Sequence, residues 1–220
     1  GKAVASETAK LFGTIARLVL DAGRVQPWSA EIPALYGVTV TLKDSAGKTI
    51  EIIPLRAGFR EVKIEGGQLL VNGQPVLIKG ANRHEMDPDG GYVVSEERMI
   101  EDIRILKENN FNAVRTCHYP DDARWYALCD RYGLYLVAEA NLESHGMGYD
   151  EKTLAKNPAY AQAHLERNIR NVRRNINHPS VIVWSLGNEA GDGPNFDACY
   201  DWIKAYDPSR PVHYERAVYN

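Results

Sequence analysis

The stretch Val181-Ile182-Val183-Trp184-Ser185-Leu186-Gly187-Asn188-Glu189 decides the fold of this chain. Five of its first six residues are apolar, and four of those are β-branched or aromatic, which is typical of a strand buried on both faces of a parallel sheet. The apolar run ends in a glycine, an amide and a carboxylic acid. Glu189 is therefore expected at the rim of the sheet, where parallel folds carry their chemistry. The alternative is that Glu189 only caps the helix that follows.

Strand and helix patterns alternate on both sides of this stretch, from Pro75 to the last residue. Five strands are expected: residues 76–80, 112–116, 134–138, a strand beginning at 181, and one beginning near 211. Four helices are expected between them, at about residues 95–106, 121–132, 158–175 and 195–206. Ser95 has the position of a helix cap, and Gly133 that of a helix stop. Short strands separated by helices predict parallel βαβ units.

A doubly wound sheet and a barrel would both fit this alternation. Residues 80–84, Gly-Ala-Asn-Arg-His, are not the glycine-rich phosphate loop of a dinucleotide-binding fold, and this favours the barrel. A closed (β/α)8 barrel needs eight strands and about 250 residues. The sequence therefore predicts an α/β fold that is the first half of a TIM barrel. Alone it would expose two sheet edges and one core face, which is an aggregation hazard.

The first 60 residues predict β structure instead. Residues 35–42 alternate apolar and polar side chains, and the turn 44–47 leads to a partner strand at 49–53. Residues 11–20 suit a strand, and residues 9–18 would also suit an amphipathic helix. Sixty residues with three or four strands are too few for an independent sandwich, which usually has about seven strands and about 100 residues. Gly66-Gly67 and Asn72-Gly73 predict a second hairpin at 61–75, so we divide the chain into domains 1–60 and 61–220.

Composition and charge exclude several classes of partner. The net charge is −3, which leaves no basic footprint for nucleic acid, and no apolar run is long enough to span a membrane. We therefore expect neither a nucleic-acid nor a membrane partner. The three cysteines lack metal-type spacing and are expected to be reduced and partly buried. The chain does not begin with Met or with a signal-peptide pattern, so we expect a piece of a longer protein.

Polar and ionisable side chains follow all five expected strands. In a parallel barrel these positions surround one mouth. Each has an ordinary structural explanation by itself, but such groups after five consecutive strands indicate a functional rim. The rim residues are Asn82, Arg83, His84 and Glu85; Arg115, His118 and Tyr119; Glu139, Asn141, Glu143, Ser144 and His145; Asn188 and Glu189; and Tyr214, Glu215 and Arg216.

Three chemistries could use this set. A glycosidase needs a carboxylic acid and a second carboxylate; Glu189 suits the acid, and Asn188 could bind a sugar hydroxyl. A metallohydrolase could use His84, His118 and His145. Glu143 and His145 with Glu189 would suit Mg²⁺ or Mn²⁺, although Glu143 and His145 could equally form only a local hydrogen bond.

Five ordered motifs then identify a resemblance. They are Gly58-Phe59-Arg60, residues 72–85 (NGQPVLIKGANRHE), 115–120 (RTCHYP), 139–146 (EANLESHG), and 177–180 (NHPS) running on to 184–189 (WSLGNE). These motifs closely resemble glycoside hydrolase family 2, and within it the lacZ-type bacterial β-galactosidases. The similarity runs from about residue 27 to residue 215.

The resemblance implies a retaining glycosidase, with a (β/α)8 barrel preceded by an immunoglobulin-like β-sandwich whose C-terminal part would be residues 1–60. It implies that Glu189 is the general acid/base and that Glu143, His145 and Glu189 are Mg²⁺ ligands, with Mn²⁺ as a substitute and Na⁺ elsewhere in the intact enzyme. His84, His118 and Asn188 would bind the β-galactoside. The nucleophilic Glu would lie beyond Asn220, so we expect the 220 residues alone to be inactive. A homo-oligomeric enzyme of the bacterial cytoplasm or periplasm would fit.

Three alternatives stay open on the sequence. The first is another specificity of the same family, a β-glucuronidase or β-mannosidase. The second is a non-catalytic fragment or binding module that needs its missing half. The third is a metallohydrolase with zinc on His84, His118 and His145.

Overall fold

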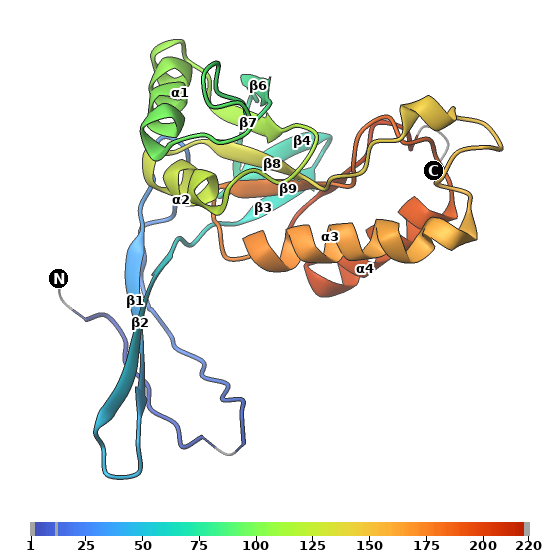
Figure 1. The fold of residues 1–220 in the computed structure, drawn as a ribbon. Coiled ribbons are helices and arrows are strands. Elements are labelled where there is room, and N and C mark those ends of the chain that lie inside the picture. The colour runs from blue at the N-terminus through green and yellow to red at the C-terminus, as the bar shows by residue number, and fades with distance from the viewer. Residues whose placement is uncertain (1–2, 12, 218–220) are drawn as a thin grey trace.

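A computed structural model describes residues 3–11 and 13–217 of the chain (Figure 1). Within these ranges the largest sheet is parallel and has five strands in the order β10-β9-β8-β7-β6. Its strands are β6 (Gly80–Arg83), β7 (Ala113–Thr116), β8 (Tyr135–Glu139), β9 (Val181–Ser185) and β10 (Val212–His213). The connecting helices are α1 (Glu96–Glu108), α2 (Ala123–Tyr132), α3 (Ala161–Asn175) and α4 (Pro194–Tyr206). Sequential parallel strands joined by helices confirm the partial barrel.

Local chemistry explains where the helices begin and end. The Ser95 side chain caps α1 by accepting a hydrogen bond from the backbone N–H of Arg98, and Asp122 caps α2 through the backbone N–H of Arg124. Gly133 ends α2 in the left-handed conformation at φ 79°, which glycine adopts without a steric penalty. The helix expected from residue 158 starts as a 3₁₀ turn, η2 (Pro158–Tyr160), and becomes α-helical at Ala161.

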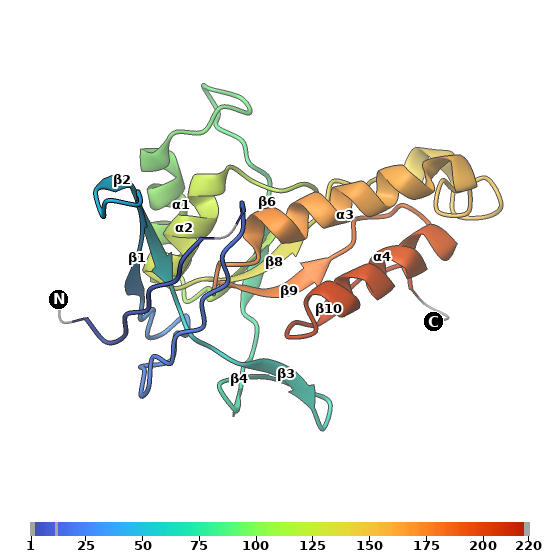
Figure 2. The same cartoon turned by 90° about the horizontal axis from the view of Figure 1, so that it is seen from below.

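The helices cover one face of the parallel sheet, with α1 against α2 and α3 against α4 (Figures 1 and 2). The main core lies between these helices and the outward-facing strand residues, and includes Met99, Trp125, Leu136 and Trp184. The three free cysteines, Cys117, Cys129 and Cys199, are all buried, more completely than the sequence predicts. No helix in the described ranges combines the length and apolar character needed to cross a bilayer.

A second apolar cluster closes the N-terminal end of the parallel sheet. It joins Trp28 and Ala30 to Ala113, Tyr135 and Ile182 at the strand starts. The antiparallel sheet of β3 (Val62–Glu65), β4 (Gln68–Val71) and β5 (Gln74–Pro75) packs here and confirms the hairpin expected at 61–75. Because apolar packing occupies this end, only the C-terminal end of the strands is left for polar chemistry. The boundary between the domains 1–60 and 61–220 stays a prediction.

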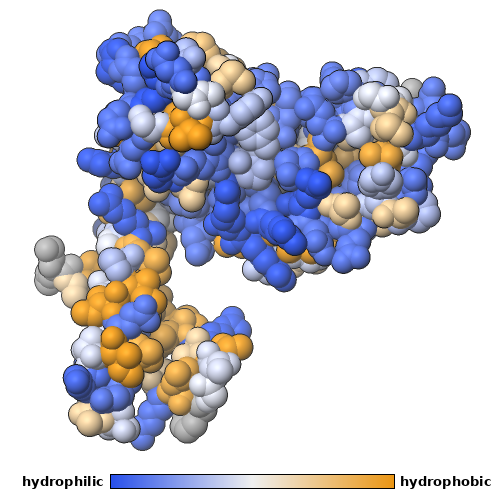
Figure 3. Space-filling model, in the orientation of Figure 1, coloured by the Kyte–Doolittle hydropathy of each residue, from blue (hydrophilic) through white to orange (hydrophobic). Residues whose placement is uncertain are grey.

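The N-terminal region is less compact. β1 (Tyr36–Lys43) and β2 (Thr49–Ala57) form the expected antiparallel hairpin, which projects away from the parallel sheet (Figure 1). Its apolar side chains are exposed and form the largest orange patch in Figure 3. The expectation of a strand or helix at 11–20 is wrong for the described residues of that segment. Ile15 and Val19 there are 82% and 79% exposed, and without an apolar surface to cover, neither element gains the packing that stabilises it.

The first barrel strand also lies later than expected. Residues 76–79 are outside the parallel ladder, and β6 is Gly80–Arg83. The cause is the side chain of Asn112: its Oδ1 accepts from the Lys79 N–H at 2.8 Å, and its Nδ2 donates to the Leu77 carbonyl at 2.9 Å. These two bonds use backbone groups of Leu77 and Lys79, so the strand begins only at Gly80. Asn82 and Arg83 therefore lie inside the strand rather than after it.

Candidate active site

The loops that follow β8 and β9 are joined directly at the C-terminal end of the sheet. The backbone N–H of Asn188 donates to the Leu142 carbonyl at 2.7 Å, and Glu143 and Asn188 form an isolated parallel bridge. A Cβ atom at Gly187 would lie 2.6 Å from that same carbonyl oxygen, so only glycine allows this approach. The contact aligns two side chains, and Asn188 Nδ2 donates to Glu143 Oε1 at 2.9 Å.

The three residues expected to bind a metal come together on these loops. Glu143, His145 and Glu189 each offer a ligand atom, and all three atoms lie within 4.8 Å of one another. His145 Nδ1 is 3.5 Å from Glu143 Oε1 and 3.8 Å from Glu189 Oε2. Two carboxylates and one imidazole, partly open to solvent, form a donor set that suits Mg²⁺ or Mn²⁺.

Glu189 is held by its backbone, and its side chain accepts no hydrogen bond from the residues that the structure describes. Its φ of +42° lies in the left-handed region, which costs a non-glycine residue about 1 kcal/mol or more. The Glu189 N–H donates to Glu215 Oε1 at 2.6 Å, which secures this conformation. The carboxylate itself is 46% exposed. Solvent and ligands can therefore reach a carboxylate whose backbone is fixed.

A buried carboxylate, Glu139, organises the layer beneath. It is the last residue of β8, is fully buried, and accepts two bonds from Arg115, at Nε (2.7 Å) and Nη2 (3.0 Å). His118 Nδ1 lies 2.8 Å from Glu139 Oε1, and Ser185 Oγ donates to Oε2 at 2.6 Å. Arg115 Nη2 also donates to Asn188 Oδ1 at 2.8 Å. Glu139 thus fixes the imidazole of His118 directly, and it fixes the amide of Asn188 through Arg115.

The three residues expected to bind sugar lie at the C-terminal end of the sheet: His84 and His118 follow the adjacent strands β6 and β7, and Asn188 follows β9, on the other side of β8. The rings of His84 and His118 are 5.2 Å apart and edge-to-face. Asn188 uses its amide oxygen with Arg115 and its amide nitrogen with Glu143, and retains one lone pair and one N–H for a ligand. The structure therefore brings His84 next to His118, and Asn188 next to the Glu143–Glu189 group. Their roles toward a substrate stay predictions.

Sequence reasoning placed Glu139 and Arg115 at the rim but gave neither a functional role. The period of two along each strand shows which face a residue occupies, but not which residues it meets on the neighbouring strands. Glu139 shares a face with Val137, which pairs with Arg115 across the ladder, and Glu139 itself pairs with Ser185. Arg115, Glu139 and Ser185 therefore lie side by side on one face of the sheet.

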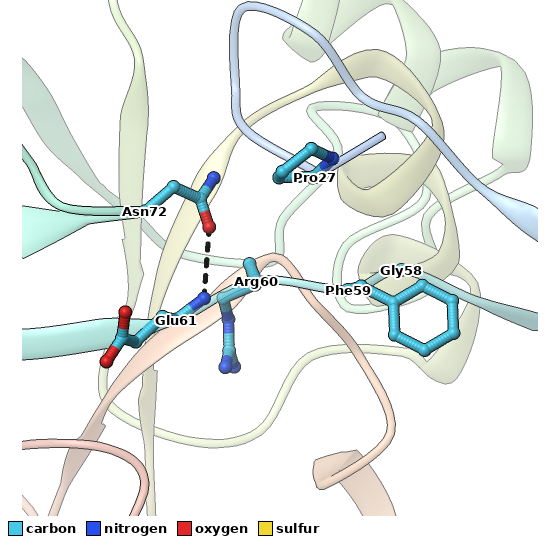
Figure 4. Close-up of a pocket in the computed structure, with 6 residues that line it drawn as sticks. All are labelled: Pro27, Gly58, Phe59, Arg60, Glu61 and Asn72. Atoms are coloured by element: carbon cyan, nitrogen blue, oxygen red, sulfur yellow. Dashed lines mark hydrogen bonds between the residues drawn. The ribbon is translucent and has the colours of Figure 1, made fainter. Parts of the chain in front are cut away.

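An open, shallow hollow lies elsewhere, beside the start of β3, with a volume of about 420 Å³ (Figure 4). Its lining residues are Pro27, Gly58, Phe59, Arg60, Glu61 and Asn72. Arg60 donates from Nε to the Pro179 carbonyl and from Nη2 to the Val181 carbonyl, at 3.0 and 2.7 Å. Asn72 Oδ1 accepts from the Glu61 N–H at 3.0 Å. The two Arg60 bonds join the N-terminal segment to the start of β9, which is a structural role.

Fold and rim together define a class of protein: an α/β barrel of the TIM type, with acidic and imidazole groups at the carboxyl ends of its strands. The chain belongs to glycosyl hydrolases family 2. Residues 62–220 match the TIM barrel domain of that family, and residues 2–60 match a second domain described as glycosyl hydrolases family 2.

Individual relatives agree with this assignment. The chain is 52% identical over 196 residues to a beta-galactosidase of Alteromonas mediterranea, covering 89% of this chain and 19% of that protein. It is 51% identical over 208 residues to a beta-galactosidase of Lactococcus lactis, covering 94% of this chain and 21% of that protein. The chain thus spans about a fifth of the length of these relatives.

Solved structures show the same fold at lower identity. A β-glucuronidase from Ruminococcus gnavus, in complex with D-glucuronic acid, aligns with a TM-score of 0.75 at 29% identity, covering 86% of this chain and 32% of that chain. A β-galacturonidase from Eisenbergiella tayi bound to galacturonate aligns with a TM-score of 0.72 at 30% identity, covering 85% and 33%.

Proposed function

We propose that this chain is the acid/base part of a retaining β-galactosidase, which hydrolyses terminal non-reducing β-D-galactose residues. The observation that carries the proposal is the convergence of Glu143, His145 and Glu189 at the C-terminal end of the barrel strands. Identity of 51–52% to two β-galactosidases supports the galactoside specificity.

Glu189 is the general acid/base in this proposal. In the first step it protonates the glycosidic oxygen as the aglycone leaves, and in the second it removes a proton from the water that releases the sugar. Partial exposure of its carboxylate suits both steps, because the leaving group and the water must reach the same oxygen. The carboxylate that forms the covalent intermediate comes from a later part of the polypeptide.

The remaining rim residues orient the sugar. Asn188 has a free amide N–H beside Glu189, and its position is fixed by Arg115 and Glu143. His118 is fixed by Glu139, and His84 lies against it. Three hydrogen-bonding groups, which follow β6, β7 and β9 at the same end of the sheet, can hold hydroxyls of one sugar ring, which lowers the cost of reaching the transition state.

Glu143, His145 and Glu189 fit the Mg²⁺ that we propose as the cofactor, since carboxylate oxygens are its preferred ligands and the cluster is open to water. Mn²⁺ suits the mixed oxygen and nitrogen donors equally well. When bound, the ion would supply positive charge that holds the Glu189 carboxylate in place. We also propose that the intact enzyme is a homo-oligomer.

A uronidase is the second candidate, because two solved structures that align with the chain are a β-glucuronidase in complex with D-glucuronic acid and a β-galacturonidase bound to galacturonate. A uronate carboxylate needs a cation, and one of the rim arginines, Arg115, is already engaged by Glu139 and Asn188. Comparing kcat/KM for nitrophenyl β-galactoside and β-glucuronide on the intact enzyme separates the two. A preference for the glucuronide would overturn the galactosidase proposal.

The acid/base role is tested with Glu189→Gln in the intact enzyme. We expect kcat/KM for a galactoside with a poor leaving group to fall by about 10²–10⁴-fold, the usual contribution of general acid–base catalysis. A substrate with an activated leaving group should lose less in the first step, since it needs no proton. Glu166→Gln on the exposed face of α3 is the matched control. Equal activity of the two variants would refute the assignment.

A further inference from the structure

A second cluster of metal-binding side chains lies at the same rim, on the loops after β6 and β7. His84, Cys117 and His118 each offer a ligand atom, and all three atoms lie within 4.8 Å of one another. The donors are two imidazole nitrogens and a sulfur, whereas Glu143 and Glu189 offer oxygens. Soft thiolate and imidazole ligands select Zn²⁺ and similar ions, and carboxylates select Mg²⁺. The two clusters therefore differ in the ion that each prefers.

The spacing of these donors is close to what zinc requires. Zinc bonds of about 2.0–2.3 Å in a tetrahedral site place neighbouring donor atoms about 3.3–3.8 Å apart. Donors within 4.8 Å need to approach by about 1 Å, which is within the reach of side-chain rotation. His84 is exposed, so it is free to make this movement and leaves a fourth position open to water.

His118 is already prepared as a ligand. Its Nδ1 lies 2.8 Å from the carboxylate of Glu139, which is fully buried. Histidines that bind metals commonly donate one ring N–H to a carboxylate, which fixes the ring and increases the basicity of the other nitrogen. The bond to Glu139 leaves Nε2 as the available nitrogen of His118. This outer carboxylate is an observation independent of the cluster itself.

Cys117 supplies the selective ligand. It follows β7 directly and is 1% exposed, and its backbone N–H is fixed by a bond to the Arg83 carbonyl at 3.1 Å. Zinc binding would form a Zn–S bond and release the thiol proton to solvent, without a change of oxidation state. A thiol fixed beside two imidazoles needs little rearrangement to bind an ion that enters from the side of His84.

We propose that His84, Cys117 and His118 form a second metal site, specific for zinc-like ions and separate from the Glu143–His145–Glu189 cluster. Because His84 and His118 are also the candidate sugar-binding histidines, an ion bound there occupies part of the sugar pocket. Zn²⁺ then acts as an inhibitor that competes with the galactoside. The competition rests on the proposed function, whereas the binding does not.

Binding is measured on the intact polypeptide with Co²⁺ as the probe and with Mg²⁺ in excess to fill the oxygen-rich cluster. We expect the thiolate-to-cobalt absorption in the wild type and in the control Cys199→Ser, whose cysteine lies in the core. Cys117→Ser should lose the absorption and bind Co²⁺ more than about 100-fold more weakly, because even outer-shell partners of metal ligands contribute about 10–100-fold. His84→Ala, at an exposed position, should weaken binding without a risk to folding.

Two results would overturn the site: no thiolate absorption in the wild type, or absorption that persists in Cys117→Ser. Competition is read separately, as Zn²⁺ raising KM for the galactoside without lowering kcat, an effect that Cys117→Ser should reduce. Cobalt binding in a protein without galactosidase activity would refute the proposed function and leave the metal site standing. Galactosidase activity without cobalt–thiolate absorption would refute the metal site and leave the proposed function standing.

Discussion

The C-terminal end of the parallel sheet has two layers: a strand layer, formed by residues at the strand ends, and a loop layer, formed by residues of the loops that follow. Each layer carries a glutamate, and the two glutamates differ in burial. In the strand layer, Glu139 is fully buried and accepts bonds from Arg115 and Ser185 while contacting His118. In the loop layer, the Glu189 side chain is 46% exposed, and its Oε2 lies 3.8 Å from His145 Nδ1. The two residues are the same amino acid at the ends of neighbouring strands. Their environments separate them into a positioning group and a group available for proton transfer.

The comparison shows how the same end of the sheet holds some side chains in fixed positions and leaves others accessible for reaction. A carboxylate with all of its lone pairs occupied cannot exchange a proton with a ligand, but it can orient its partners. Glu139 orients Arg115 and His118, and Arg115 in turn orients Asn188. The loop layer then adds exposed side chains above a fixed base. Two substitutions, in order of decreasing effect, test whether the layers act in this way, and a third measures a charge outside both layers.

The strand layer is tested by Glu139→Gln. The substitution leaves the largely buried Arg115 without its counter-charge, and removing one partner of a buried pair costs about 3–5 kcal/mol. Urea unfolding of the variant should show a lower midpoint with an unchanged slope.

Glu189→Gln is the matched control for this prediction, since the same chemical change in the loop layer should alter stability by only about 0.5 kcal/mol or less. Equal destabilisation by both substitutions would mean that the two layers do not differ as described.

The connection between the two loops of the loop layer is tested by Gly187→Ala. A Cβ atom there would lie 2.6 Å from the Leu142 carbonyl oxygen, so the loops after β8 and β9 must separate. We expect a loss of about 1–3 kcal/mol, the usual cost of overpacking, together with weaker Mg²⁺ binding as Glu143 moves from Asn188. The measurements are urea unfolding and Mg²⁺ titration.

Gly146→Ala is the control, because a Cβ at Gly146 meets no atom within 4 Å and needs no left-handed backbone. Unchanged Mg²⁺ affinity in Gly187→Ala would show that the Glu143–Asn188 contact does not assemble the cluster.

The loop layer could be predicted from the sequence and the strand layer could not. Parallel strands end at one edge, so Glu143, His145 and Glu189 are expected together once the strands are found. The role of Glu139 depends on the register that places Val137 opposite Arg115 and Ser185 opposite Glu139. A single sequence does not contain that register. Period-two faces can be assigned within one strand, but their alignment between strands is set by packing.

The same limit explains the errors in the fold. Helix ends were predicted well because Ser95 and Gly133 act on their own backbone. The start of β6 was not, because the side chain that delays it, Asn112, is 33 and 35 residues away from its two partners. The prediction of a strand or helix for residues 13–20 was wrong for a related reason. A periodic apolar pattern forms a stable element only where another part of the protein packs against its apolar face.

The smallest expected effect lies outside both layers, at the start of α2. Asp122 Oδ1 accepts from the backbone N–H and the Nε of Arg124, at 2.8 and 3.0 Å. Arg124 lowers the pKa of Asp122 from 3.8 to about 2, through its side chain and then its backbone N–H. Because the folded pKa is below the unfolded value, the carboxylate contributes stability above pH 3.8 and loses it as the pH falls through about 2.

Asp122→Asn isolates this charge, since asparagine is an equally good helix cap. Asp122 is 36% exposed, so solvent screening limits the effect, and we expect a loss of about 1 kcal/mol or less near neutral pH. Urea unfolding at several pH values should show the difference between wild type and variant shrinking below about pH 4. If the difference in stability did not change with pH, the loss would come from a poorer helix cap in the asparagine variant and not from the missing charge. In either case Mg²⁺ affinity should not change, because α2 begins away from the loops that carry Glu143, His145 and Glu189.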